Sequence, residues 1–386
     1  MLKSKFLSVV LLLVSISLTL IVGEGLSRLI VNPVDFLKPR VSPDPILGYK
    51  IPPGSAGHDK WGFRNRYVPA SADIVAIGDS QTYGVSAVAS QSWPAQLSRI
   101  TGAEVYNLAL GGYGAMEYDY LLRKQAMQLN PKIIVVGIYL GNDFIDAFRT
   151  VYGRPGWEHL RASHKNYPLP KGNALQAEDP VKIFGGIREW FSCHSVIYRM
   201  ATFSMGGLFH RLEVKYQEAH KTQTTKRTVV LSDHSGRLIT VFTPDTTLSV
   251  LNTASPEVQE GIRLTGDTLV GMKDFCNRKQ IRFLVIFLPT KESVYWPLIV
   301  KMSQQPEKKL VQLVVQQETS AKAILMDRLE KSGVCFEDVL ADLRAKVEKE
   351  ALYPNNADNH PNRYGYQVIA EKVARVLATD RRCENK

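Results

Sequence analysis

The stretch Ile74-Val-Ala-Ile-Gly-Asp-Ser80-Gln-Thr-Tyr-Gly84 sets the organisation of the rest of the chain. Residues 74–77 are small or β-branched apolar side chains, a pattern typical of a strand buried on both faces of a parallel sheet. The run stops at Gly78-Asp79-Ser80. In an open α/β sheet, ligands bind beyond the carboxyl ends of the strands. Ser80 is therefore expected where a nucleophile can act, although the same triplet is also ordinary turn chemistry that caps a helix.

The composition limits the classes of protein and of partner. The chain has 386 residues, of which 45% are hydrophobic, enough for one large domain with additions or for two modest ones. Its 48 basic and 37 acidic residues give a net charge of +11. This charge favours an acidic surface such as phospholipid headgroups or an anionic polysaccharide. The basic residues are scattered and not interleaved with aromatic ones, which argues against a nucleic-acid partner.

The cysteines argue against a zinc site. None of them forms a C-x-x-C pair, so a structural zinc site is not expected. In an exported domain they allow up to two disulfides, with three pairings that the sequence leaves open. The four are Cys193, Cys276, Cys335 and Cys383.

The N-terminus predicts a membrane anchor. Residues 6–22 are apolar residues, Ser and Thr, and follow Lys3 and Lys5. This length predicts an uncleaved transmembrane helix over residues 6–23. The preceding lysines predict residues 1–5 in the cytoplasm and the remaining chain on the periplasmic or other extracytoplasmic side, on a single-pass protein of the cell (inner) membrane. Gly23 and Gly25 leave open the alternative that the segment is removed as a signal peptide.

Residues 24–72 are rich in Pro and Gly and show no sustained helical period, which predicts an extended arm. Two segments within it carry aromatic side chains, namely Asp44-Pro-Ile-Leu-Gly-Tyr49 and Trp61-Gly-Phe-Arg-Asn65. We therefore expect the arm to pack against the domain that follows.

Residues 73–386 predict a three-layer α/β/α sandwich on a parallel five-stranded sheet. Residues 149–255 break the alternation and predict an insertion with an apolar helix over 183–205 and a hairpin over 228–242. Further strands are predicted at 105–110, 132–139, 281–288 and 334–336. One helix is predicted to start near residue 92, and another, after Gly114, to end at residue 128. Later helices are predicted at 256–279, 308–331, 338–350 and 364–379.

Polar residues follow several of these strands. A serine hydroxyl needs a base within hydrogen-bond reach, a group that orients the base, and donors aimed at the oxyanion. The sequence offers Ser80, the backbone of Gly112, the Asn142 amide, and His360 with Asp358 nearby. A metal site on Asp79, Asp143, Asp358 and His360 is conceivable, but acyl transfer through serine needs no metal.

At these residues the chain resembles the SGNH hydrolases, also called the GDSL family. The resemblance rests on Gly78-Asp79-Ser80, Asn107-Leu-Ala-Leu-Gly-Gly112-Tyr-Gly114, Gly141-Asn142-Asp143 and Asp358-x-His360-Pro-Asn362. It implies a flavodoxin-like sheet, Ser80 as nucleophile, His360 as general base and Asp358 as its orienting acid. It also implies an oxyanion hole made by the Ser80 and Gly112 N–H groups and the Asn142 amide, with no cofactor and no metal. Asp79 and Asp143 are expected to support the turns.

The sequence departs from the family pattern twice. Leu140 stands two places before the Asn, where many members have Gly, and Ala357 stands three places before the His, where many have the acid. The Asp-x-His spacing and Pro289-Thr-Lys291 are similar to the branch that includes the alginate and related polysaccharide O-acetyltransferases. Lys291 is accordingly a candidate substrate contact. His194, His210 and His220, in the insertion, are expected to be non-catalytic.

Three functions follow as hypotheses. The first is a membrane-anchored serine esterase that forms an acyl-serine intermediate on an ester-bearing small molecule. The second is an O-acetyltransferase or acetylesterase acting on a cell-surface polysaccharide. The third is a catalytically inactive domain that binds glycan.

Overall fold

The computed structural model describes residues 2–162, 167, 185–202, 227–233, 235–302 and 307–379. The chain divides into two compact units. The first comprises Met1–Ser42, Ile51–Gly62 and Ala177–Gln223, and the second comprises Pro43–Lys50, Phe63–Gln176 and Thr224–Lys386.

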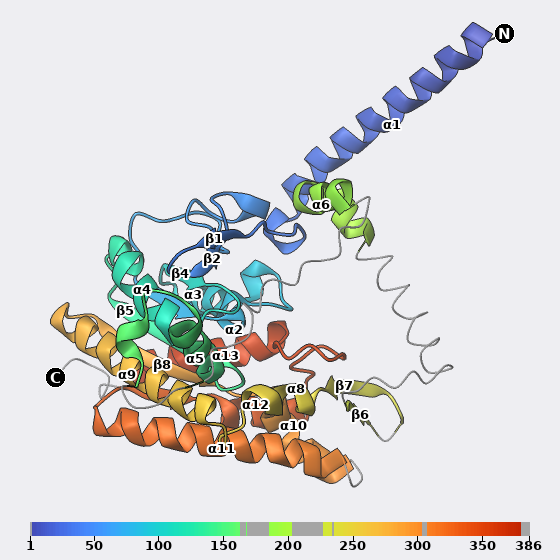
Figure 1. The fold of residues 1–386 in the computed structure, drawn as a ribbon. Coiled ribbons are helices and arrows are strands. Elements are labelled where there is room, and N and C mark those ends of the chain that lie inside the picture. Colours follow the sequence, from blue (N-terminus) through green and yellow to red (C-terminus); the bar gives the residue numbers. More distant parts are fainter. Residues whose placement is uncertain are drawn as a thin grey trace. The chain divides into compact units, whose positions relative to one another are not determined.

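A five-stranded parallel sheet forms the centre of the second unit, with the strand order β4-β3-β5-β8-β9 (Figure 1). In chain order this is 2-1-3-4-5, the flavodoxin-like arrangement. The three central strands are buried along nearly their whole length, because helices cover both faces of the sheet. The strands are β3 (Ile74–Gly78), β4 (Val105–Ala109), β5 (Ile133–Tyr139), β8 (Arg282–Leu288) and β9 (Phe336–Asp338).

Two helical layers enclose the sheet, which confirms the predicted α/β/α sandwich. On one face, side chains of β3, β5 and β8 share a core cluster with side chains of α3 (Trp93–Thr101), α10 (Lys291–Met302), α12 (Leu340–Val347) and α13 (Arg363–Thr379). The other layer consists of three helices that contact one another, namely α4 (Ala115–Lys124), α5 (Asp143–Gly153) and α9 (Pro256–Arg278), of which α4 contacts β3 and α9 contacts β8. Helix α11 (Glu307–Lys331) contacts both α9 and α10.

The predicted elements occur with small shifts at their ends. The last strand begins at Phe336 instead of Val334, and the helix expected to reach residue 128 stops at Lys124. A 3-10 turn, η4 (Ala126–Leu129), continues from there to Asn130, whose φ of 46° reverses the chain. Shorter 3-10 turns are η3 (Ala89–Gln91) and η5 (Glu158–Leu160).

The predicted insertion is split between the two units. Its hairpin is confirmed as β6 (Val229–Ser232) and β7 (Leu238–Phe242), followed by α8 (Pro244–Val250). Val229, Leu231 and Phe242 join the core cluster of the second unit, so the hairpin is part of that core. The apolar helix appears as α6 (Gly185–His194) and a second helical segment over 196–202, both in the first unit. His210 and His220 lie outside the described residues.

The first unit begins with α1 (Leu2–Ile30), a single helix with a mean hydropathy of 2.7 in its most apolar window (Figure 1). Residues 24–30 continue this helix instead of starting an extended arm, and the end of the membrane span at residue 23 stays a prediction. Glu24 and Arg28 pair across one helical turn at 2.8 Å, and no proline follows until Pro33. Nothing therefore breaks the helix at its two glycines.

The rest of the arm consists of short elements and turns. It contains η1 (Pro33–Asp35), the paired strands β1 (Ser42–Asp44) and β2 (Gly48–Lys50), and η2 (Ser55–Gly57). Tyr49 and Phe63, from its two aromatic segments, belong to the second unit and pack within it. The Tyr49 ring lies 5.4 Å from that of Tyr113, and Phe63 is buried with its ring 6.4 Å from that of Tyr106.

The cysteines support at most one intramolecular disulfide instead of two. Cys193 and Cys276 are free and buried, whereas Cys335 is disulfide-bonded. Burial raises the pKa of the Cys276 thiol to about 12, which keeps it protonated and unreactive. Cys383 lies outside the described residues.

Candidate active site

Ser80 lies at the switch point of the sheet. β3 is the first strand of the sheet in the chain and has β4 on one side and β5 on the other, and α2 (Ser80–Tyr83) follows it directly. Such a switch point is where open α/β sheets bind ligands, because the connections leave in opposite directions. Asp79 is the N-cap of α2, and its Oδ1 accepts a hydrogen bond from Gln81 N at 2.8 Å. The turn thus caps a helix and also presents the hydroxyl.

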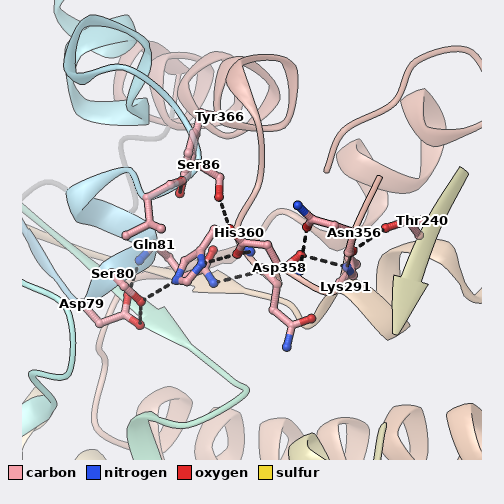
Figure 2. A network of polar contacts seen from close by, with 12 residues as sticks. Asp79, Ser80, Gln81, Ser86, Thr240, Lys291, Asn356, Asp358, His360 and Tyr366 are labelled. Carbon is pink, nitrogen blue, oxygen red and sulfur yellow. Dashed lines mark hydrogen bonds and ion pairs between the residues drawn. The ribbon is translucent and has the colours of Figure 1, made fainter. Parts of the chain in front are cut away.

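Ser80, His360 and Asp358 form one hydrogen-bonded line (Figure 2). His360 Nε2 lies 2.8 Å from Ser80 Oγ, and His360 Nδ1 lies 2.6 Å from Asp358 Oδ1. An ionised carboxylate only accepts hydrogen bonds, so Nδ1 carries a hydrogen and donates a hydrogen bond to Asp358. In the neutral imidazole, Nε2 is then free to accept the proton of the serine hydroxyl.

Asp358 is held in its ionised form. Burial alone would raise its pKa, but hydrogen bonds from His360 and Ser86, together with the charge of His360, lower the pKa to about 2. The Ser86 hydroxyl donates to Asp358 Oδ2, and the His360 backbone N–H donates to Oδ1 at 3.0 Å. Ser86 is a non-glycine residue with a φ of 66°, a costly backbone conformation. Such strain is common where a loop must aim a functional group.

The glycine loop after β4 lies beside the serine. A Cβ placed on Gly111 would meet the Ser80 Cβ at 3.3 Å. Gly112 has a φ of +77°, and a Cβ there would lie 2.7 Å from the Tyr49 hydroxyl. That hydroxyl donates to the Gly111 carbonyl oxygen, and Tyr113 in turn donates to the Tyr49 carbonyl oxygen at 2.6 Å. Tyr49 therefore fixes the loop whose N–H group is a candidate oxyanion donor.

Asn142 follows β5, the neighbouring strand, and its amide is oriented by an acid. Asn142 Nδ2 donates to Asp146 Oδ2 at 2.7 Å, which leaves its second amide hydrogen for another acceptor. Burial raises the pKa of Asp146 to about 6, against the lowering effect of Arg149.

The two supporting acids are fully buried. Burial raises the pKa of Asp79 to about 6, although the Gln81 N–H and the charge of His360 oppose the shift. Burial also raises the pKa of Asp143, and the charge of Asp79 adds to the shift. Asp143 Oδ2 accepts from Tyr139 N at 3.0 Å and from the Tyr118 hydroxyl at 3.1 Å. Both carboxyl groups hold turns at the strand ends.

Lys291 is not open to solvent. Its side chain is fully buried, and Nζ donates to the carbonyl oxygens of Asn356 at 2.9 Å and Asp358 at 2.8 Å (Figure 2). Burial lowers its pKa to about 8, against the raising effects of Glu292 and Asp358. Thr240, from the hairpin, donates to the Pro354 carbonyl oxygen at 2.8 Å. These contacts hold the loop that carries Asp358 and His360, and a substrate contact by Lys291 stays a prediction.

The sequence motifs left several contributors unnoticed. Asp146 had a usable signal, because a residue four places after Asn142 lies on the same helical face. Tyr49 was noticed only as an aromatic anchor. Ser86 and Thr240 had no local signal, since their partners are more than a hundred residues away in the chain. Among the described residues, no group of three or more His, Cys, Asp or Glu side chains is arranged to hold a metal ion.

Comparison with known proteins gives distant structural likenesses only. No protein-family model and no curated protein matches the sequence. A GDSL-like lipase from Bacteroides thetaiotaomicron is similar at 8% identity, covering 79% of this chain and 87% of that chain, with a TM-score of 0.35. An alpha/beta hydrolase enzyme from the metagenome of Lake Arreo, Spain, is similar at 12% identity, covering 83% of this chain and 99% of that chain, with a TM-score of 0.37. An acetylxylan esterase from Geobacillus stearothermophilus is similar at 9% identity, covering 81% of this chain and 97% of that chain, with a TM-score of 0.37. The fold class of this chain stands on its own strand order, which is the one that the SGNH resemblance implies.

Proposed function

We propose that this chain is a membrane-anchored serine esterase of the SGNH type. The observation that carries the proposal is the line from Ser80 Oγ through His360 to Asp358, with separations of 2.8 and 2.6 Å. A hydroxyl, a base and an orienting carboxylate at these distances are the parts that nucleophilic catalysis needs.

The chemistry proceeds in two halves. Ser80 Oγ attacks the ester carbonyl carbon while its proton passes to His360 Nε2. The oxyanion that develops is met by the Ser80 and Gly112 N–H groups and by the free Asn142 amide hydrogen. His360 then gives its proton to the departing alcohol, which leaves an acyl-serine. Water, deprotonated by His360, attacks this acyl group. His360 then returns that proton to Ser80 Oγ as the acyl–oxygen bond breaks, which releases the acid and restores the Ser80 hydroxyl.

Two features support anchoring and export. Helix α1 has the length and composition to cross a membrane, and Lys3 and Lys5 before it favour a cytoplasmic N-terminus. The disulfide at Cys335 suits an oxidising compartment such as the periplasm. If α1 is retained, mass spectrometry of the protein from membranes will detect the peptide that contains Phe6 to Gly25. Loss of this peptide from the mature protein would contradict the anchor.

A fluorophosphonate probe tests the catalytic serine. We expect the native chain to be labelled and the Ser80→Ala variant to be unlabelled. Ser90→Ala, a change at another serine of the same domain, is the control and should be labelled normally. Absence of labelling in the folded native chain would overturn the proposal and favour a glycan-binding domain without activity.

The acceptor of the acyl group is tested with an activated acetyl ester, with and without polysaccharide. Hydrolysis predicts release of acetate at a rate that polysaccharide does not raise. Faster turnover together with acetylated polysaccharide would replace esterase by O-acetyltransferase, because water and sugar hydroxyls are chemically alike at this site.

A further inference from the structure

Helix α6, in the first unit, has an apolar face that the described residues leave exposed. Ile187, Trp190 and Phe191 are 64%, 54% and 41% exposed. Residues at i, i+3 and i+4 lie on one side of a helix, so these side chains form one strip. The rings of Trp190 and Phe191 meet edge to face at 5.1 Å. We call these three residues the aromatic strip. Exposed apolar groups gathered in this way indicate a docking surface.

The opposite side of α6 is attached to the rest of the first unit. Cys193 and the following Val196 are buried, and Val196 lies in a cluster with Leu37 and Ala56. Glu189, on the same side, pairs with Lys38 at 3.0 Å. The aromatic strip therefore points away from the unit that holds the helix.

The end of α6 is fixed to the end of α1 (Figure 1). The Glu24 carboxylate accepts hydrogen bonds from the Ser195 hydroxyl at 3.0 Å, Val196 N at 3.0 Å and Ile197 N at 3.2 Å. It thereby caps the helical segment over 196–202. Arg28 donates to the His194 carbonyl oxygen at 2.5 Å. Arg28 thus holds the last residue of α6, and Glu24 holds the residues that follow it, at the last two turns of α1.

This end of α1 corresponds to the outer boundary of a bilayer. Glu24 stands 18 residues after Phe6, the first residue of the apolar run. At a rise of about 1.5 Å per residue, this separation is about 27 Å along the axis. The hydrocarbon core of a bilayer is about 30 Å thick. If Phe6 enters the core on one side, Glu24 and the attached α6 come to the headgroup region on the other.

We infer that α6 lies along the outer headgroup region of the membrane that α1 crosses, with its aromatic strip toward the acyl chains. The inference rests on the proposed anchoring by α1. Trp is favoured at this depth because its ring is apolar and its N–H is polar. Helices with aromatic residues on one face and charges on the other, here Arg188 and Glu189, bind in this plane. The net charge of +11 suits anionic headgroups.

Quenching by brominated lipid tests the depth of Trp190. The full chain is reconstituted into vesicles of phosphatidylcholine and phosphatidylglycerol, in which the phosphatidylcholine carries bromine on its acyl chains near the headgroup. The chain has five tryptophans, so the quenching of the native chain is compared with that of Trp190→Phe. Trp157→Phe is the matched control. Trp190 is exposed, so its conservative replacement is not expected to disturb folding.

We expect the bromine-dependent quenching of the native chain to be largely lost in Trp190→Phe and kept in Trp157→Phe. If the chain floats with the vesicles but Trp190→Phe is quenched as strongly as the native chain, the inference is overturned while the anchor stands. A cross-link between aromatic strips of two copies, together with unchanged quenching, would assign the strip to a protein interface instead. If the chain fails to float with vesicles at all, the anchor and this inference both fall.

Discussion

Two hydrogen bonds, one to each carboxylate oxygen, favour the ionised form of Asp358. His360 Nδ1 contacts one carboxylate oxygen and the Ser86 hydroxyl contacts the other. With a pKa of about 2, Asp358 is a carboxylate throughout the neutral range. It can therefore fix the imidazole tautomer and, in the proposed mechanism, stabilise the imidazolium.

Replacing the carboxylate by an amide should remove both effects. We expect Asp358→Asn to lower kcat for an activated ester by about 10²- to 10⁴-fold, because the wrong imidazole tautomer would face Ser80. Ser86→Ala removes only one hydrogen bond to the Asp358 carboxylate and should lower kcat about tenfold. Steady-state kinetics on the two variants measure the difference. Full activity of Asp358→Asn would show that this acid has no part in catalysis.

Lys291 is predicted to act on the position of His360 rather than on substrate. Removing its ammonium group takes one hydrogen-bond donor from each of the Asn356 and Asp358 carbonyl groups, so the loop should shift. We expect Lys291→Met to lower kcat by about 10- to 100-fold for esters of any acyl length with KM little changed, since a small misplacement of a catalytic group is costly. Lys301→Met, at an exposed residue of the same helix, should have almost no effect. A KM increase that depends on the ester would instead indicate a substrate contact.

At the scale of elements, the approach of two helices depends on one glycine. Helices α5 and α9 pack together, and a Cβ on Gly261 of α9 would lie 1.9 Å from the Phe144 carbonyl oxygen. No side chain can be accommodated there unless the helices separate. Since α5 begins directly after Asn142, this packing also sets where the candidate oxyanion donor lies.

Two glycines of α9 give a matched pair of variants. We expect Gly261→Ala to lower the free energy of unfolding by about 3 kcal/mol, because it overpacks a helix contact. A Cβ on Gly271 meets nothing within 4 Å. Gly271→Ala should therefore raise the stability by about 0.5–1 kcal/mol through better helix propensity. Thermal unfolding of both variants measures the difference, and equal effects would contradict the close packing.

At the scale of the whole molecule, stability should depend on buried acids. Burial raises the pKa of Glu318 to about 7, that of Asp79 to about 6 and that of Asp146 to about 6. A carboxyl group whose pKa is higher in the folded state binds its proton more tightly there. The contribution of such a group to stability is complete below its pKa in the unfolded state and is lost as the pH rises through its pKa in the folded state. The domain should therefore become less stable from pH 5 to pH 8.

Glu318 allows this dependence to be tested. Its carboxylate accepts from Ser293 Oγ at 2.7 Å and Thr290 N at 3.1 Å, at the start of the helix that begins with Lys291. We expect the contribution of Glu318 to the free energy of unfolding to fall by about 2 kcal/mol between pH 5 and pH 8. Glu318→Gln should remove that part, and Glu330→Gln, at an exposed residue of the same helix, should not. An unchanged pH dependence of Tm in Glu318→Gln would contradict the pKa shift.

Local sequence patterns were enough to predict most strands of the sheet and the identity of the candidate site residues. The apolar runs around Ile74, Ile133 and Arg282 predicted three strands with ends close to those observed, because periodicity and turn residues act between neighbours in the chain. Residues 24–30 continue the first helix instead of starting the extended arm, because Gly23 and Gly25 weaken a helix without breaking it.

The sequence by itself determined that a buried strand ends in Gly78-Asp79-Ser80 and that a histidine follows an acid near the far end of the domain. Only the tertiary structure decided that Ser80 and His360, 280 residues apart, lie 2.8 Å from each other. The same is true of the buried ammonium of Lys291 and of the junction between α1 and α6. A turn is encoded by adjacent residues, whereas such contacts depend on how packed layers align distant segments, and no local pattern specifies that alignment.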